Sequence, residues 1–187
     1  MSDRKKTAPP SAASYLAVES LRDGSPIRVR AIRPDDKVRL VEHFRSLSPQ
    51  SVYFRFFEIK RTLGDEDLRH LTELDFADHV GLAATMDGDG GDERFIGVGR
   101  YLRSGEKSRA EVAFAVLDEH QGRGIGTILL KHLGRIAQTN GIAQFTADVM
   151  GGNKQMLEVF ANSGFRTHDS HESGTVRVVM DLDPPPG

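Results

Sequence analysis

The chain has 187 residues, of which 38% are hydrophobic and 28% charged, and its formal net charge is −2. This length and composition predict one globular domain with flanking tails, and the balanced charge argues against a surface dedicated to nucleic acid or to an anionic membrane. Cysteine is absent, which excludes an acyl-cysteine intermediate, disulfide bonds and cysteine-ligated zinc.

The hydropathy pattern gives no sign of a membrane segment. No apolar run reaches the roughly twenty residues that a spanning helix needs. The start of the chain, MSDRKKTAPP, is charged and lacks the apolar core of a signal peptide. A cytoplasmic protein without a membrane partner is therefore expected.

The folded domain is expected to occupy residues 26–183. Residues 1–25 show no sustained periodicity and predict a disordered N-terminal tail, and the proline-rich residues 184–187 predict a short C-terminal tail. The first strand is predicted at residues 27–31, where apolar and charged residues alternate.

Three short helices are predicted after this strand. The first is capped by Asp35 or Asp36, the second begins at the cap and first-turn proline Ser48-Pro49, and a third is suggested by residues 66–74. The apolar stripe of the first helix is expected to comprise Val38, Val41, Phe44 and Leu47, with Leu40 beside it.

The second of these helices contains an aromatic and basic cluster, Tyr53, Phe54 and Arg55. Two interpretations of this cluster stay open. The side chains pack a helical hairpin beneath a sheet, or they form one wall of an acceptor site.

Strands and turns dominate the following part of the chain. Strands are predicted at residues 80–86, 95–102 and 110–117, then a helix from Ile125, a strand at 144–149, a helix at 153–163 and strands at 165–168 and 175–182. The helix after residues 110–117 permits that strand and the one at 144–149 to be parallel. The sequence thus predicts a mixed α/β (α+β) fold, a twisted and mostly antiparallel sheet of roughly six or seven strands with helices on both faces.

A glycine-rich hexad, Gln121-Gly122-Arg123-Gly124-Ile125-Gly126, lies between a predicted strand and a strongly amphipathic helix. Unpaired amides at a helix start, together with the helix dipole, favour a phosphate ligand. Glycine lets such a ligand approach the backbone. A dinucleotide fingerprint is not favoured because its third glycine is missing, and a P-loop is not favoured because no Gly-Lys-Ser/Thr follows.

The hexad resembles the acyl-CoA pyrophosphate loop of the GNAT N-acetyltransferase superfamily. The resemblance extends over residues 27–183 and includes a second unit, residues 153–165, in which Asn153 can cap a helix that ends at Gly164. A narrower resemblance, to bacterial Pat-type protein-lysine acetyltransferase domains, rests on Ile32-Arg33-Pro34-Asp35-Asp36, Leu47-Ser48-Pro49, Tyr53, Arg55-Phe56-Phe57 and Ala110-Glu111-Val112-Ala113-Phe114.

The resemblance implies acetyl-CoA as the donor substrate, no metal, and a GNAT-like fold in which the two parallel strands splay apart to admit the pantetheine arm. The donor-binding residues that it implies are Phe114, Ala115 and Val116 for pantetheine, Gln121, Gly122, Arg123, Gly124, Ile125, Gly126 and Thr127 for the pyrophosphate, and Asn153 near the donor. The superfamily often has a tyrosine as general acid where this chain has Phe160. The proton for the leaving thiolate must then come from another residue, from water or from the acceptor.

Glu111 is the predicted general base. It carries the only charge in the strand at residues 110–117, and alternation places it on the face of Ala113 and Ala115, whose small side chains leave space. Partial burial would raise the pKa of its carboxyl group toward a useful value. The alternatives are an exposed glutamate at a strand end and an ion pair with Arg109.

His120 is the rival base, because it directly precedes the loop and histidine has a suitable pKa. His168 and His171 are not favoured as metal ligands, since no third strong ligand is near them in the sequence. The other histidines are expected at the surface or on helix flanks: His43, His70, His79 and His132.

The sequence therefore predicts an N-acetyltransferase that moves an acetyl group from acetyl-CoA to a primary amine by direct attack, with Glu111 as general base. A protein lysine is the favoured acceptor, and no nucleic-acid partner is expected. A small-molecule amine acceptor and a non-catalytic acyl-CoA-binding module are the alternatives.

Overall fold

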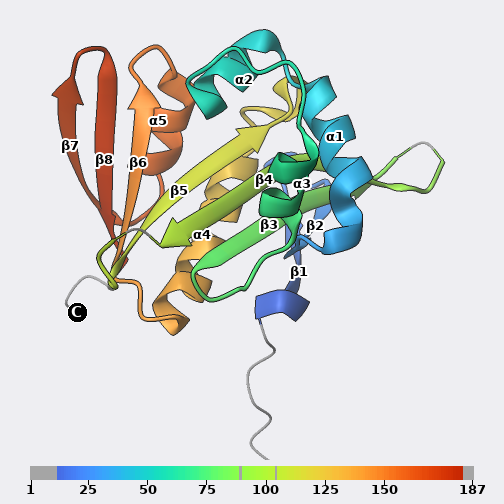
Figure 1. The fold of residues 1–187 in the computed structure, drawn as a ribbon, viewed down its shortest axis with the longest axis horizontal. Coiled ribbons are helices and arrows are strands. Elements are labelled where there is room, and N and C mark those ends of the chain that lie inside the picture. The colour runs from blue at the N-terminus through green and yellow to red at the C-terminus, as the bar shows by residue number, and fades with distance from the viewer. Residues whose placement is uncertain (1–11, 89, 104, 183–187) are drawn as a thin grey trace, which may run out of the picture.

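One mixed sheet of eight strands forms the centre of the protein (Figure 1). The structure is a computed structural model that describes residues 12–88, 90–103 and 105–182. The strand order is β1-β2-β3-β4-β5-β6-β8-β7. The strands are β1 Leu16–Ser20, β2 Pro26–Ala31, β3 His79–Asp87, β4 Glu93–Arg103, β5 Arg109–Val116, β6 Gln144–Met150, β7 Arg166–Glu172 and β8 Thr175–Asp181.

The connections between strands contain the helices. These are α1 Lys37–Ser46, α2 Pro49–Phe56, α3 Asp65–Thr72, α4 Ile125–Thr139 and α5 Lys154–Ala161, with short 3₁₀ turns η1 Ala12–Ser14, η2 Pro34–Asp36 and η3 Asp118–His120.

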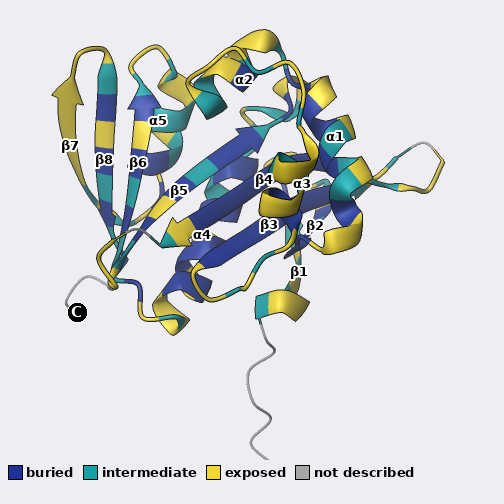
Figure 2. Ribbon diagram, in the orientation of Figure 1, coloured by how far each residue is buried: buried dark blue, intermediate teal, exposed yellow. Residues whose placement is uncertain are grey.

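Helices cover both faces of the sheet, as the sequence predicts (Figure 1). Helix α4 packs across β3, β4 and β5 on one face with α5 against it, whereas α1 and α2 pack against β4 and β5. A separate hydrophobic cluster lies under each set of helices: Leu129 and Leu133 belong to the first, and Phe44 and Val52 to the second. The central strands are therefore largely buried, while β7 at the edge is exposed (Figure 2).

Strands β5 and β6 are parallel, and all other neighbouring strands of the described sheet are antiparallel. The pairing between β5 and β6 runs only from Arg109↔Gln144 to Glu111↔Thr146. Beyond that point β5 pairs with β4 alone and β6 with β8 alone, and the two strands diverge (Figure 1). This confirms the parallel pair expected from the intervening helix.

Side-chain caps fix the start of two helices at the predicted residues. Ser48 Oγ accepts a hydrogen bond from the amide of Ser51 at 3.2 Å ahead of α2. Asn153 Oδ1 accepts one from the amide of Met156 at 3.2 Å ahead of α5. Each cap satisfies a backbone donor that the helix itself leaves free, so both helix starts are confirmed.

The predicted apolar stripe of α1 is wrong at one residue. Val38 is 68% exposed, whereas Leu40, His43 and Phe44 are buried. Two residues advance a helix by about 200°, so Val38 points away from the face on which Leu40 lies.

The expected N-terminal tail is wrong for residues 12–25, because Leu16–Ser20 form strand β1. This strand pairs with β2 from Leu16↔Arg30 to Ser20↔Pro26 and brings the sheet to eight strands. Its side chains alternate only between exposed and half-buried, since an edge strand has little to cover it. Residues 1–11 and the expected C-terminal tail at 184–187 lie outside the described residues.

Three histidines that were expected at the surface are buried instead. His43 Nδ1 donates to the carbonyl of Phe95 at 3.1 Å, and His132 bonds Glu19 through Nε2 at 2.8 Å and the hydroxyl of Tyr15 through Nδ1. His79 is 8% exposed. Hydrogen bonds and ring contacts offset part of the cost of burying these imidazoles, while Nε2 of His43 is buried without a hydrogen-bond partner among the described residues.

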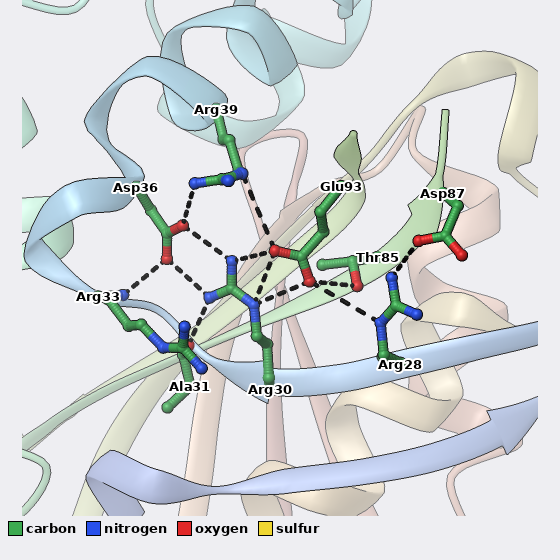
Figure 3. A network of polar contacts seen from close by, with 9 residues as sticks. All are labelled: Arg28, Arg30, Ala31, Arg33, Asp36, Arg39, Thr85, Asp87 and Glu93. Atoms are coloured by element: carbon green, nitrogen blue, oxygen red, sulfur yellow. Dashed lines mark hydrogen bonds and ion pairs between the residues drawn. The ribbon is translucent and has the colours of Figure 1, made fainter. Parts of the chain in front are cut away.

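A buried ion network joins the first strands to α1 (Figure 3). Arg30 of β2 bonds both carboxylate oxygens of Asp36, at 2.7 and 2.8 Å, and its Nε donates to Glu93 Oε1 at 3.0 Å. Arg39 contacts the same Asp36 at 3.2 Å, and Thr85 donates to Glu93 at 2.9 Å. The network therefore connects β2, α1, β3 and β4 on the side away from the diverging strands.

Candidate functional site

The divergence of β5 and β6 opens a cleft of about 810 Å³. One wall is the free edge of β5, the other is β6 with the start of α5, and the glycine loop closes one end. Residues of α2 also line the cleft. A cleft of this size suits a ligand with a long, narrow arm.

The glycine loop has a backbone that requires glycine. Gly122 has φ +72° and Gly124 has φ +94°, a left-handed region that other residues rarely adopt. A Cβ at Gly122 would meet no atom within 4 Å, so the backbone there is open to a ligand. The amides at the start of α4 follow directly, which makes the loop a fitting phosphate cradle. Gly122, Gly124, Ile125, Gly126 and Thr127 all line the cleft.

The backbone of β5 forms the next part of the wall. Phe114, Ala115 and Val116 line the cleft and pair on their other side with β4. Their groups toward β6 have no strand partner, because the β5–β6 pairing stops at Glu111. Asn153, which caps α5, lies on the opposite wall. The structure thus brings the predicted pantetheine residues and Asn153 together.

Gln121 and Arg123 also contact the protein itself. Gln121 lines the cleft, but its Nε2 donates to Val116 O at 3.1 Å and to Ser51 Oγ at 3.3 Å. Arg123 donates to Asp23 at 2.6 Å, and its Nη1 lies 2.7 Å from Nδ1 of His120. Arg123 is absent from the residues that line the cleft.

Arg22 supplies a positive charge that the sequence analysis missed. It lies in the β1–β2 connection and lines the cleft. Its Nη1 donates to the carbonyl of Gly122 at 3.3 Å, and its Nε is 3.6 Å from where a Cβ of Gly124 would be. Residues 1–25 were expected to be disordered, so no local sequence signal placed Arg22 beside the loop.

Glu111 lies where β5 and β6 separate. Its side chain is exposed in the cleft rather than partly buried as the hypothesis assumed. It makes no side-chain hydrogen bond or ion pair with any described residue, because Arg109 bonds Gln144 at 2.8 Å and Glu106 at 3.4 Å instead. The ion pair with Arg109 is therefore wrong.

His120 lines the cleft beside the glycine loop. Burial lowers its pKa, the carboxylate of Glu119 opposes this, and the guanidinium of Arg123 adds to the lowering. The imidazole is therefore neutral at pH 7, with Nδ1 accepting from Arg123.

Phe160, the residue at which the resemblance implied a tyrosine in other members of the superfamily, lies in the wall of the cleft. Its ring is 2% exposed and lies 6.1 Å from that of Phe114, centre to centre. No tyrosine is among the described residues that line the cleft.

The aromatic and basic cluster of α2 divides between the two interpretations. Phe54 and Arg55 line the cleft, while Tyr53 is 41% exposed outside it. Val52 and Phe56 pack into the hydrophobic cluster that lies between the sheet and helices α1 and α2.

Helix α2 is fixed to the glycine loop by Asp118 of η3. This carboxylate accepts from Ser48 Oγ at 2.7 Å, Ser51 Oγ at 2.9 Å and the Ser48 amide at 3.0 Å. Burial alone would raise the pKa of Asp118, but these hydrogen bonds outweigh it and lower the pKa. The start of α2 is thereby held beside η3.

The described residues contain no group of three or more His, Cys, Asp or Glu side chains placed to hold a metal ion. Within the same ranges, no helix is long and apolar enough to cross a membrane.

Comparison with known proteins agrees with this geometry. A profile of the acetyltransferase (GNAT) family matches residues 47–165. A Pseudomonas aeruginosa protein described as an acetyltransferase is 30% identical over 148 residues, 79% of each chain. The acetyltransferase Pat of Mycolicibacterium smegmatis is 30% identical over 165 residues, 88% of this chain and 48% of that protein, so the chain spans about half the length of Pat.

A solved structure shows the same architecture. The crystal structure of the GNAT domain of S. lividans PAT superposes with a TM-score of 0.81 at 39% identity, over 94% of this chain and 99% of that one.

Proposed function

Because the chain belongs to the acetyltransferase (GNAT) family, whose donor is acetyl-CoA, we propose that it acetylates a primary amine and that the acceptor is the side chain of a protein lysine. The observation that carries the proposal is the position of Glu111. It stands at the point where β5 and β6 separate, at the end of the cleft away from the glycine loop.

The donor is proposed to lie along the cleft. Amides of the glycine loop and the start of α4 bind its pyrophosphate, and free backbone groups of Phe114, Ala115 and Val116 bind its pantetheine arm. The open space at Gly122 and the unpaired edge of β5 support this placement. Asn153 on the opposite wall narrows the cleft around the arm.

The reaction needs a group that removes a proton from the acceptor. An alkylammonium ion has no free electron pair at neutral pH, so it must lose a proton before nitrogen attacks the thioester carbon. Glu111 is proposed to take that proton, directly or through one water. The C–N bond then forms, the C–S bond breaks, and the nitrogen loses a second proton. The thiolate is protonated by that second proton or by water.

Acidic side chains in the cleft support an amine acceptor. Glu111, Asp148 and Glu158 all line it, and carboxylates attract an approaching ammonium group. Asp148 is held by Arg177 at 2.8 Å on both oxygens, whereas Glu111 has no partner among the described side chains. The likeness to the Pat proteins supports a lysine as that amine. A cytoplasmic location is part of the proposal and rests on composition alone.

The deciding experiment replaces Glu111 with glutamine. In an acetyl-CoA consumption assay over a panel of proteins and small amines, Glu111→Gln is expected to lower kcat by roughly 10²–10⁴, the usual share of general acid–base catalysis. CoA affinity, measured by calorimetry, should not change. The loss should shrink as pH rises, because more of the acceptor is then already neutral.

Two controls accompany this variant. Glu106→Gln removes a carboxylate from the nearby hairpin outside the cleft and should leave kcat unchanged, and His120→Ala should cost little. If Glu111→Gln keeps near-normal kcat at pH 7 while His120→Ala loses it, His120 is the base and the assignment fails. Absence of CoA binding at millimolar ligand would reject the whole proposal.

A further inference from the structure

Arg55 of α2 is a half-buried cation without an anionic partner. It lines the cleft, and its guanidinium carbon lies 4.9 Å from the centre of the Phe56 ring. No residue that the structure describes forms a hydrogen bond or ion pair with its side chain. Burial lowers the pKa of Arg55, and the negative charge of Glu111 opposes this.

Arg100 of β4 places a second unpaired cation behind the first. It is 7% exposed, and its side chain makes one hydrogen bond within the described ranges, from Nη1 to His79 Nε2 at 3.4 Å. Arg55 and Arg100 share the lining of a cavity of about 20 Å³ next to the cleft. Burial, and then the charge of Arg55, lower the pKa of Arg100 to about 9.

Two adjacent guanidinium groups without a hydrogen-bonded carboxylate are an expensive arrangement. Each has lost water on burial, and each repels the other. The contrast within this chain is direct, because Arg30 is as buried as Arg100 but is bonded to both Asp36 and Glu93. The cost at Arg55 and Arg100 is recovered when an anion enters from the cleft.

The sheet register places these cations beside the proposed base. Arg100 is opposite Ala113 across the β4–β5 ladder, and Leu102 is opposite Glu111. Alternation therefore sets Arg100 and Glu111 on the same face as diagonal neighbours. Arg55 reaches this face from α2.

We propose that the acceptor carries a carboxylate close to its reacting amine, and that Arg55, with Arg100 behind it, binds this carboxylate. The inference rests on the proposed function, since it describes the acceptor of the same reaction. Glu111 and Arg55 have opposite charges in one cleft and attract each other, but they form no hydrogen bond or ion pair within the described residues. That arrangement complements a molecule bearing an amine and a carboxylate, with the amine toward Glu111 and the carboxylate toward Arg55.

Two sources of the carboxylate share this chemistry. One is an aspartate or glutamate beside the target lysine in a protein, and the other is the carboxylate of a small amino acid. A guanidinium binds either through two parallel N–H···O bonds. The experiment separates them by presenting each with a matched neutral analogue.

The first arm uses the unaltered protein. Acetyl-CoA consumption is measured with peptides in which one lysine is flanked by glutamate or by glutamine, and with a small amino acid and its amide. The carboxylate member of one pair is expected to have a kcat/KM about 10- to 100-fold higher, the range for a hydrogen bond to a charged group. Equal values within both pairs overturn the proposal, and this arm depends on no variant.

The second arm assigns the preference to Arg55. Arg55→Gln should abolish the preference, so that the carboxylate and neutral members of each pair have equal kcat/KM, and Arg55→Lys should keep only part of it, because ammonium lacks the planar fork. Arg45→Gln, an exposed arginine on the neighbouring helix α1, serves as control and should retain the full preference. If Arg55→Gln slows carboxylate and neutral acceptors equally, the guanidinium serves the acetyl group rather than the acceptor, and the inference is wrong.

Failure of the inference and failure of the proposed function give different results. Turnover of lysine peptides without a carboxylate preference leaves the acetyltransferase proposal intact and rejects the acceptor chemistry. Absence of turnover with every amine, together with absence of CoA binding, rejects the function on which the inference depends.

Discussion

At the scale of single residues, two glycines allow the effect of a substitution on ligand binding to be measured separately from its effect on stability. Gly122 and Gly141 have nearly the same backbone, φ +72° and φ +76°, and a Cβ at either would meet no atom within 4 Å. Gly122 lines the cleft and Gly141 follows α4. The two positions thus share a similar φ and differ in that only Gly122 lines the cleft.

Gly122→Ala and Gly141→Ala should therefore cost similar stability, about 1–2 kcal/mol for a left-handed alanine. Only Gly122→Ala is expected to weaken CoA binding, by roughly tenfold, because its methyl group enters the phosphate cradle. Thermal unfolding and calorimetry measure the two effects. Equal CoA affinities in both variants would contradict the placement of the pyrophosphate.

A second prediction concerns the charge that meets the donor's phosphates. Arg22 faces the loop and has no ion pair with a described residue, whereas Arg123 is held by Asp23, whose pKa hydrogen bonds from Ser25 and Arg123 lower to about 2. Arg22→Gln should weaken CoA binding by about 10-fold and reduce its salt dependence. Arg123→Gln should have the smaller effect on Kd, and the reverse order would show that Arg123 turns toward the donor on binding.

The residues of the cleft differ in how far the sequence alone predicts them. The glycine hexad and Asn153 act through local backbone geometry, which a short motif encodes, and the structure brings them to one cleft. Arg22, Arg55 and Arg100 come from three separate elements. Only the register of the sheet and the packing of α2 bring those arginines to the site, so no spacing rule reveals them.

At the scale of elements, patterns with a buried face were predicted well and edges were not. Helix α4 and strand β5 alternate buried with more exposed positions, and strands β3 and β4 are buried along most of their length and read as apolar runs. Strand β1 exposes Leu16 by 63% and Val18 by 72%, and β7 is mostly exposed along its length. Neither edge strand contrasts buried with exposed positions, which explains why β1 was missed and β7 was predicted too short.

The ion network of Figure 3 holds secondary-structure elements together through charged side chains rather than through apolar packing. Hydrogen bonds from Arg30 lower the pKa of Glu93 to about 2, although burial opposes them. For Asp36, burial would raise the pKa, but hydrogen bonds from Arg30 and the Arg33 amide outweigh it and lower the pKa. The folded protein therefore stabilises the ionised form of both carboxyl groups relative to the unfolded chain.

At the scale of the whole molecule, this network makes stability depend on acid. A carboxyl group whose pKa is lower in the folded state contributes stability above its unfolded pKa, near pH 4, and loses it as pH falls toward the folded pKa. The urea concentration at the midpoint of unfolding is expected to decrease as the pH is lowered from about 4 to about 2. Glu93→Gln should be less stable than the unaltered protein at pH 6 and should lose less on acidification.

Glu42→Gln provides the matched comparison, because Glu42 is an exposed carboxylate on α1. Its unfolding midpoint should follow that of the unaltered protein across the whole pH range. A Glu93→Gln curve that runs parallel to the unaltered protein down to pH 2 would show that the network does not set acid stability.

The short seam between β5 and β6 has a thermodynamic consequence for the whole chain. The ladder between them ends at Glu111↔Thr146, while the apolar core under α4 continues across both strands through Phe114, Phe145 and Val149. Where the two strands separate, the backbone amides that face the gap can exchange their hydrogens with water, although the core beneath them is packed. A donor bound there, as proposed, would pair with the free backbone groups of β5. Each tenfold increase of the donor concentration above its dissociation constant would then add about 1.4 kcal/mol to the free energy of unfolding. Donor binding and unfolding would then be linked equilibria. The protein would be most resistant to unfolding when the donor is bound.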